Sequence, residues 1–371
     1  MFELRTDSFR GETGRTVERV GIYEGDTRMS WATLTGTSSR LGGHLVPTLC
    51  IGGVGSAPEY RRGGNVRRIF DYAFEKSAGE PWAVAMLHPF SFNYYRKFGF
   101  ERVCDHRIVT VPMTALSHLP RFSEFHPMKE SDIPAILALY GRFSEPRNCT
   151  LTRTEAAFRI DSAPGTPFFY AWYKDGVPKA YLKLSTKKKM LTNHMGEGVL
   201  TVHEIAFDDP EGLYAALGFL RMYEGELETV VFENIAHIPE MGCAMTEYIA
   251  EKIELVPDIA ARVLDTKAVL CANIYPQKAG RFTVRVDDTL IKVRGTFRVD
   301  YENGAAEVRR LDDGAAFDLR ADAAAFTRLV YGAESMNAAL AAYLPGVTLN
   351  NDAEDFFRAF PKRACGLFEH F

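Results

Sequence analysis

The sequence lacks both a cysteine framework and a long apolar run. Its six cysteines, among 371 residues, form no Cys-x-x-Cys pair and no zinc-like spacing with histidine. We therefore expect free, buried thiols of a reducing cytoplasm rather than disulfides or a metal site. No run of about 18 apolar residues is present, and residues 1–14 have no apolar signal-peptide core. The sequence thus predicts a cytoplasmic protein that is not inserted in a membrane.

A surplus of basic residues is also missing. Lysine and arginine number 44 against 48 aspartates and glutamates, a formal net charge of −4. Sequence-independent binders of nucleic acids or anionic membranes carry a positive surplus, so both classes are excluded as partners. The composition, 46% apolar and 25% charged, is that of a folded protein, and the length suggests two or three domains.

The hydrophobic periodicity predicts an α+β (mixed α/β) fold in three units, with boundaries near residues 122 and 262. The first unit combines an antiparallel hairpin, further strands and a helix: strands 20–23, 29–34, 49–56 and 82–87, helix 67–76. The second has helices 133–140 and 210–220 and strands 168–173, 179–184 and 200–207. The third has strands 282–286, 289–293, 296–301, 306–310 and 316–319, then helices 323–331 and 353–360.

The segment between residues 51 and 66 carries the clearest chemical signal. A strand ends near Pro58, and a turn with two arginines and two glycines precedes the next helix. Amide groups of such a turn and the helix N-terminus converge on one place, where glycines allow a pyrophosphate to approach closely. Arg61 and Arg62 would add charge-assisted hydrogen bonds. The alternative is a surface turn whose arginines face water.

Two motifs together resemble the GCN5-related N-acetyltransferase (GNAT) superfamily. They are Arg61-x-x-Gly64-x-Val66, in which valine departs from the usual small residue, and Tyr95-x-Lys97-Phe98-Gly99-Phe100. Further segments resemble its enhanced intracellular survival (Eis) branch and cover nearly the whole chain. These segments are Pro58-Glu59-Tyr60-Arg61-Arg62, Pro89-Phe90-Ser91-Phe92, Arg262-Val263-Leu264-Asp265, and the ending from Phe360-Pro361-Lys362-Arg363 to Glu369-His370-Phe371.

This resemblance implies a three-domain acetyltransferase. Residues 1–122 would form the catalytic domain, 123–262 a degenerate second acetyltransferase domain, and 263–371 a sterol-carrier-protein-like domain. The catalytic domain is short at its N-terminus, because residues 2–20 cannot supply the strand and helix pair that the superfamily places before the first hairpin. The implied cofactor is acetyl-CoA, and the implied acceptors are primary amines, either aminoglycoside-like or lysine-type. The branch also implies a homo-oligomer, hexamers included.

Acetyl transfer requires an acid for the departing thiolate, a base for the amine and donors for the carbonyl oxygen. Tyr95 is the candidate acid, with a core-packed tyrosine as the alternative. The resemblance places the C-terminal carboxylate, here of Phe371, in the site as base; His370 is its rival, and a frayed tail is the alternative. Amides near residues 55–57 could face the carbonyl oxygen. The candidate cofactor-binding residues are Gly55, Ser56, Ala57, Arg61, Arg62, Gly63, Gly64 and Ser91, although Ser91 could equally be a helix N-cap.

The second unit has acids where a cofactor loop would lie. Asp208, Asp209 and Glu211 follow its strand 200–207 and would repel a pyrophosphate, so we expect one coenzyme site per chain. A different class of function stays open. The chain could be a non-catalytic acyl-CoA or lipid-binding protein that uses a cleft in its C-terminal domain.

Overall fold

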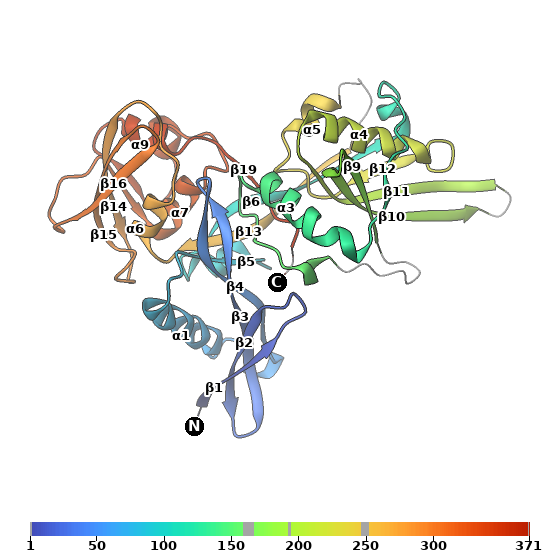
Figure 1. Ribbon diagram of the computed structural model, residues 1–371. Helices are drawn as coiled ribbons and strands as arrows, with labels where there is room; N and C mark the ends of the chain where they lie inside the picture. The colour runs from blue at the N-terminus through green and yellow to red at the C-terminus, as the bar shows by residue number, and fades with distance from the viewer. Residues whose placement is uncertain (1, 159–166, 192–193, 246–251, 370) are drawn as a thin grey trace.

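The computed structural model describes residues 2–158, 167–191, 194–245, 252–369 and 371. A single mixed sheet runs through the first two units in the order β1-β2-β3-β4-β5-β13-β6-β12-β11-β10-β9-β7 (Figure 1). Its strands are β1 (Phe2–Arg10), β2 (Thr16–Glu24), β3 (Thr27–Leu41), β4 (His44–Ser56), β5 (Val84–Leu87), β6 (Glu101–Pro112), β7 (His126–Pro127), β9 (Phe168–Lys174), β10 (Val177–Leu191), β11 (His194–Phe207), β12 (Thr229–Phe232) and β13 (Lys252–Val263).

The first unit confirms the predicted hairpin, strands and helix. Strands β1 to β4 pair antiparallel in succession, so residues 2–10, before the predicted hairpin, form a strand. Helix α1 (Asn65–Gly79) then brings the chain back to β5, which lies parallel to β4. Apolar side chains recur on one face of α1 at Ile69, Phe70, Ala73 and Phe74, and all four are buried. Helix α2 (Phe92–Arg96) follows β5.

The second unit repeats this strand order. Strands β9, β10 and β11 pair antiparallel, helix α4 (Pro210–Leu220) follows, and β12 lies parallel to β11. Its other helices are α3 (Ile133–Ser144) and α5 (Glu240–Ala244), and β8 (Arg147–Asn148) pairs with the tail strand β19 (Ala364–Cys365).

Strand β13 has a position that the sequence did not indicate. It lies between β5 and β6 and pairs antiparallel with both. Residues 252–262, which we grouped with the second unit, therefore lie between two strands of the first. Local periodicity cannot reveal this arrangement, because it depends on pairing with strands roughly 140 to 180 residues earlier in the chain.

The third unit has a five-stranded sheet in the order β16-β15-β14-β17-β18. Its elements are β14 (Gly280–Asp287), β15 (Gly295–Glu302), β16 (Ala305–Leu311), β17 (Leu319–Asp322), β18 (Val347–Leu349), α6 (Thr266–Cys271), α7 (Ala323–Tyr331), α8 (Ala338–Ala341) and α9 (Glu354–Ala359). The predicted strand 289–293 is wrong. There Asp288 Oδ1 accepts from Leu290 N (2.8 Å) and Leu290 O accepts from Val293 N (3.0 Å), so a local turn takes the place of a ladder. The predicted strand 316–319 is also misplaced, because β17 begins at Leu319.

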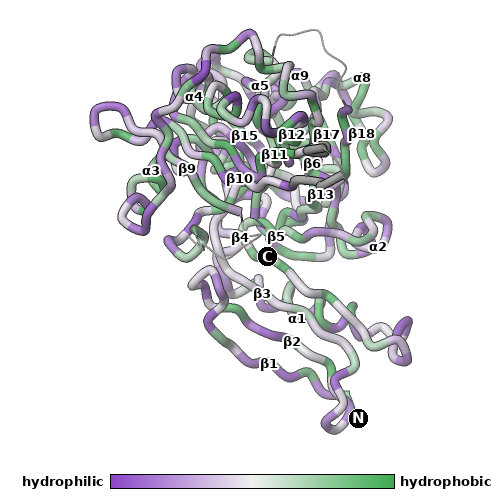
Figure 2. Tube along the Cα trace, turned by 90° about the vertical axis from the view of Figure 1, so that its right-hand side faces the viewer, coloured by the Kyte–Doolittle hydropathy of each residue, from purple (hydrophilic) through white to green (hydrophobic). Residues whose placement is uncertain are grey.

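The two faces of the sheet in the first unit pack against different parts of the protein. Leu49, Ile51 and Ala85 share a core with α1, whereas Cys50 and Met86, next to them in the strands, join the core of the third unit. The strands are thus buried on both faces. The C-terminus ends near β4 and β5, where the units meet (Figures 1 and 2).

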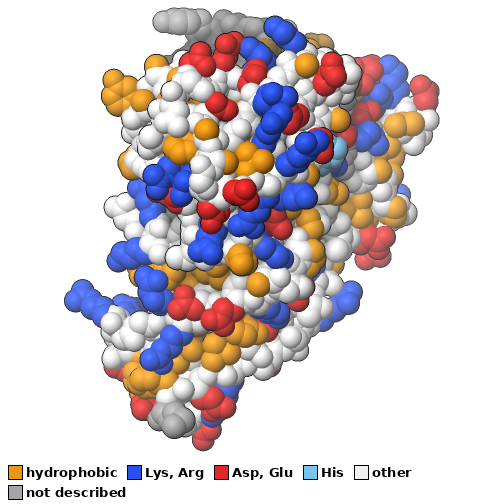
Figure 3. Space-filling model, turned by 90° about the vertical axis from the view of Figure 1, so that its left-hand side faces the viewer, with side chains coloured by type: hydrophobic (Ala, Val, Ile, Leu, Met, Phe, Trp, Pro, Cys, Tyr) orange, Lys and Arg blue, Asp and Glu red, His pale blue; other side chains and the backbone are white. Residues whose placement is uncertain are grey.

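The cysteines and the surface agree in part with the composition. All six cysteines are free, but Cys243 and Cys271 are exposed, so the prediction of buried thiols holds for four. On the face shown in Figure 3, basic and acidic side chains are interspersed. Among the described helices, none is long and apolar enough to cross a membrane.

Candidate active site

The candidate site lies where two parallel strands separate. Strands β4 and β5 pair from Thr48↔Val84 to Cys50↔Met86, after which no further pairs join them. A bulge in the β3–β4 ladder, between Trp31 and Thr33, comes at the same level. Bulges bend a strand and change where its groups point, so they are common beside functional sites. Two parallel strands that diverge here leave backbone groups available to a ligand.

The last residue of the chain occupies this gap. A Cβ placed on Gly52 would lie 2.6 Å from the carboxyl oxygen and 2.7 Å from the carboxyl carbon of Phe371. The terminal carboxyl group thus packs against the β4 backbone, and only glycine leaves room for it. The Phe371 ring lies 4.9 Å from the His88 ring, measured between centroids. Its alternative as base, His370, lies outside the described residues.

His88 and Asp258 extend the site beyond the predicted residues. His88 Nδ1 lies 3.0 Å from Asp258 Oδ1, and His88 Nε2 lies 3.2 Å from Glu369 O. Burial alone would raise the pKa of Asp258, but hydrogen bonds with His106 and His88 outweigh it and lower that pKa. Asp258 is therefore a carboxylate that orients the His88 ring toward the tail. From the sequence, His88 had no assigned role in the site, and Asp258, on β13, had no local signal either.

Tyr95 is held in an aromatic cluster at the end of α2. Its side chain is 3% exposed, and its ring contacts those of Phe70, Phe90 and Tyr94 at centroid distances of 5.9, 5.5 and 5.2 Å. Its hydroxyl makes no hydrogen bond to any described residue. Burial raises the pKa of Tyr95 to about 12, so the phenol keeps its proton at neutral pH. A protonated donor without a protein partner suits a ligand.

The loop predicted to bind a phosphate is exposed. After the short 3₁₀ turn Pro58–Tyr60, residues 61–64 are exposed, and Gly64, at φ +78°, is the N-cap of α1. Arg61 Nε makes a long contact of 3.5 Å with Ser56 O, and neither Arg61 nor Arg62 has an ion-pair partner among the described residues. Two unpaired cations therefore stand beside the N-terminus of a helix. This combination attracts anions.

Four of the predicted cofactor residues already make contacts within the protein. Ala57 N donates to Met29 O at 3.0 Å, so that amide is not available to a carbonyl oxygen. Ser91 Oγ accepts from Tyr94 N at 3.3 Å and caps α2, as the alternative prediction has it. Gly55 packs against the Trp31 ring: a Cβ there would lie 2.6 Å from it. Ser56 Oγ lies 2.6 Å from Ser30 Oγ.

The acids of the second unit are paired with cations. Asp209 caps α4 through Gly212 N (2.9 Å) and lies 2.7 Å from Lys179 Nζ. Asp208 lies 2.6 Å from Arg142 Nε. A side-chain cap and two ion pairs thus occupy the N-terminus of α4. In the first unit, the corresponding N-terminus, that of α1, follows an open loop.

The C-terminal tail, from residue 364 to residue 371, reaches the site along a buried path. Gly366 N donates to Asn148 O at 3.1 Å, and a Cβ on Gly366 would lie 2.4 Å from the His237 ring. Phe368 packs edge-on against the same ring, with 4.5 Å between centroids. Both nitrogens of His237 are buried and have no partner among the described residues. Burial, with the nearby cations Arg147 and Arg153, lowers the pKa of His237 to about 3.

This depressed pKa predicts acid sensitivity. Below about pH 6.5 the unfolded chain takes up a proton at His237 that the native protein does not, so stability falls as the pH drops from there toward about 3. Between pH 7.5 and 5 the wild type should lose roughly 2 kcal/mol more unfolding free energy than His237→Gln. Urea unfolding at both pH values measures this. Equal losses in the two proteins would contradict it.

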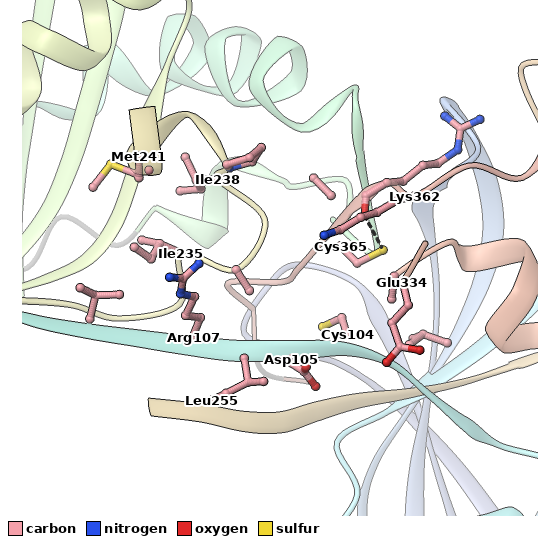
Figure 4. Close-up of a pocket in the computed structure, with 18 of the residues that line it drawn as sticks. Cys104, Asp105, Arg107, Ile235, Ile238, Met241, Leu255, Glu334, Lys362 and Cys365 are labelled. Carbon is pink, nitrogen blue, oxygen red and sulfur yellow. Dashed lines mark hydrogen bonds between the residues drawn. The ribbon is translucent and has the colours of Figure 1, made fainter. Parts of the chain in front are cut away.

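A separate cavity of about 670 Å³ lies where the three units meet (Figure 4). Cys104 and Arg107 of β6, Ile235 and Met241 of the second unit, and Cys365 of the tail are among its lining residues. None of its described lining residues belongs to β4, β5 or α2. The cavity is therefore distinct from the site at Phe371.

Comparisons with known proteins agree with this geometry. Residues 5–103 match the model of the acetyltransferase (GNAT) domain. No curated protein matches the chain. A GCN5-related N-acetyltransferase from Anabaena variabilis is similar in structure, at 17% identity, a TM-score of 0.82, and coverage of 95% of this chain and 89% of that one.

Two further solved structures have the same overall arrangement. A GCN5-related N-acetyltransferase from Kribbella flavida has 20% identity, a TM-score of 0.77, and coverage of 96% of this chain and 88% of the other. Eis1 from Mycobacterium abscessus has 14% identity, a TM-score of 0.77 and full coverage of both chains. At these identities the likeness concerns the fold. Together with the matched domain, it indicates an acetyltransferase and confirms the predicted GNAT-like, mixed α/β fold.

Proposed function

We propose that the protein is an acetyl-CoA-dependent N-acetyltransferase for primary amines, either aminoglycoside-like or lysine-type. The observation that carries this proposal is the terminal carboxyl group of Phe371 against Gly52, in the gap between β4 and β5. Two independent features of the same unit support it, namely the open loop with Arg61 and Arg62 and the protonated Tyr95.

The loop before α1 would hold the pyrophosphate of coenzyme A. Its exposed arginines supply charge, the first amides of α1 supply donors, and Gly64 leaves open space, since a Cβ there would meet nothing within 4 Å. Replacing both Arg61 and Arg62 by alanine should weaken coenzyme A binding about 100-fold, because each charge-assisted hydrogen bond contributes roughly 1.5 kcal/mol. Titration calorimetry measures this. The control is Arg142→Ala, which alters a surface ion pair of the second unit; equal affinity in both variants would contradict the assignment.

Two groups would move the protons of acetyl transfer. The Phe371 carboxylate would accept the proton that the attacking amine loses, directly or through one water, and Tyr95 would donate a proton to the sulfur as its bond to the acetyl carbon breaks. His88, oriented by Asp258, would keep the tail in place through Glu369 O. Carboxylates at Asp258 and Phe371 also favour a cationic acceptor.

Release of free thiol from acetyl-CoA tests the enzymatic activity. We expect turnover when the panel contains aminoglycosides, polyamines and lysine peptides, and none when the amine is omitted. Absence of thiol release with every amine, from folded protein that binds coenzyme A, would contradict an N-acetyltransferase. It would favour a binding protein instead.

The third unit fits the proposed sterol-carrier-like domain in having one sheet covered by helices. Its interior is filled by large aromatic side chains, those of Phe282, Phe297, Phe326 and Phe356. A hollow on its surface is lined largely by charged residues, among them Arg281, Asp300 and Glu307. A lipid chain would be poorly solvated there, so the acetyltransferase is the better proposal. Light scattering would test the homo-oligomer, hexamers included, that we propose alongside it.

A further inference from the structure

The second unit contains the same strand separation as the first. Strands β11 and β12 pair in parallel from Val199↔Thr229 to Val202↔Phe232 and then part, with α4 between them in the chain. The β10–β11 ladder also has a register shift beside this point, between Lys183 and Leu184. The two units can therefore be aligned by their last parallel pairs, Cys50↔Met86 and Val202↔Phe232.

This alignment identifies equivalent residues. Two positions beyond the last pair, the first unit has Gly52 and His88, and the second has Glu204 and Asn234. The tail contacts three of these four places directly, those of Asn234, His88 and Gly52. Asn234 Nδ2 donates to Leu367 O, whereas His88 lies 3.2 Å from Glu369 O and Gly52 lies against the Phe371 carboxyl group. The tail thus passes from the gap of the second unit into the gap of the first.

Glu204 is linked to the tail by a buried arginine. Arg153, whose side chain is 5% exposed, forms two contacts with Glu204, Nη1 to Oε1 at 2.5 Å and Nη2 to Oε2 at 3.1 Å. Its Nε donates to Glu369 Oε1, which also accepts from Tyr140 Oη at 3.0 Å. The guanidinium stacks 3.8 Å from the Tyr140 ring. Each polar group of Arg153 is therefore used to join the tail to the second unit.

The charges favour this arrangement over a free tail. Burial opposes a charged Arg153, but Glu204 and Glu369 outweigh it and raise its pKa above the ordinary value. Without Glu369, Arg153 would have Glu204 as its remaining carboxylate partner. A guanidinium is a rigid fork that can bind two carboxylates at once. Glu369 stands two residues before Phe371, so holding its side chain limits how far the terminal carboxyl group can move.

We propose that the second unit uses its β11–β12 gap as a socket for the C-terminal tail, with Arg153 as the residue that positions the Phe371 carboxylate in the site of the first unit. This inference rests on the proposed function for the role of that carboxylate. The socket itself rests only on the contacts of Arg153 and Asn234 with the tail and on the pairing of Arg153 with Glu204. The proposal gives a role to the second unit, in which paired acids occupy the N-terminus of α4 where a pyrophosphate would bind.

Release of phenylalanine by a carboxypeptidase specific for C-terminal aromatic residues tests the socket without relying on activity. In Arg153→Met and in the nearly isosteric Glu369→Gln, release should be at least tenfold faster than in the full-length wild type. The kcat for acetyl transfer should fall about tenfold, whereas the Kd for coenzyme A should not change. Arg153→Lys should restore part of kcat. The matched control, Arg142→Ala on the neighbouring helix α3, should behave as the wild type.

The outcomes separate the proposed socket from the proposed catalytic role of the terminal carboxylate. Release at the wild-type rate in both variants, with circular dichroism showing intact folding, would overturn the socket. Faster release with an unchanged kcat would support the socket and contradict a catalytic role for the terminal carboxylate. Faster release with a lower kcat supports both.

Discussion

Adding two residues after Phe371 should lower kcat about 100-fold or more and leave the Kd for coenzyme A unchanged. The extension moves the carboxylate away from Gly52 and puts a neutral amide where the proposed base lies. General base catalysis contributes about 10²- to 10⁴-fold, which sets the size of the effect. Steady-state thiol release and calorimetry give the two constants.

Two companion variants make this test specific. Phe371→Leu keeps a terminal carboxylate and should retain kcat within a few fold. Gly52→Ala leaves the chain ending as it is, but its Cβ would overlap the Phe371 carboxyl group, so kcat should fall. Full activity in the extended protein would show that the terminal carboxylate is not the base.

Tyr95→Phe should lower kcat about 100-fold with little change in the KM for the amine. The ring is buried among aromatic neighbours, and phenylalanine preserves those contacts. Because the hydroxyl bonds to no described residue, its removal leaves no described partner unsatisfied and isolates its role toward the substrate. With its pKa at about 12, Tyr95 should add no alkaline limb to the kcat profile below about pH 10.

The neighbouring residue provides the control. Tyr94 also lies on α2 and touches the same cluster, but it is less buried than Tyr95. Tyr94→Phe should leave kcat within a few fold. If Tyr95→Phe were equally active, Tyr95 would be a packing residue and the thiolate would take its proton from elsewhere.

Local signals predicted the parts of the site that lie close together in the chain. The turn of residues 59–66, α1 after it and Tyr95 on a short helix are each set by glycine, apolar periodicity or a capping serine within a few residues. The charge contrast between Arg61 and Asp208 was equally readable. The sequence did not show that Asp208 pairs with Arg142, because these two residues lie far apart in the chain.

The errors have one physical origin, which is competition between local and distant hydrogen bonds. Residues 289–293 alternate like a strand, yet the Asp288 side chain and the Leu290 carbonyl oxygen accept from the amides of Leu290 and Val293 in a turn. Ser91 similarly uses its hydroxyl for α2. A pattern of residue types shows what a segment can do, but not which partner its polar groups find.

Residue patterns alone predicted an acetyltransferase-like first unit, a loop for phosphate and an acid candidate, and they showed that the chain has no basic surplus. The groups that complete the site come together only through long-range contacts. The fold inserts β13 beside β5, so that Asp258 meets His88, and it leads the tail past Glu204 and Asn234 to Gly52. These contacts join residues far apart in the chain, and they hold because buried charges and backbone groups must find partners where water is excluded.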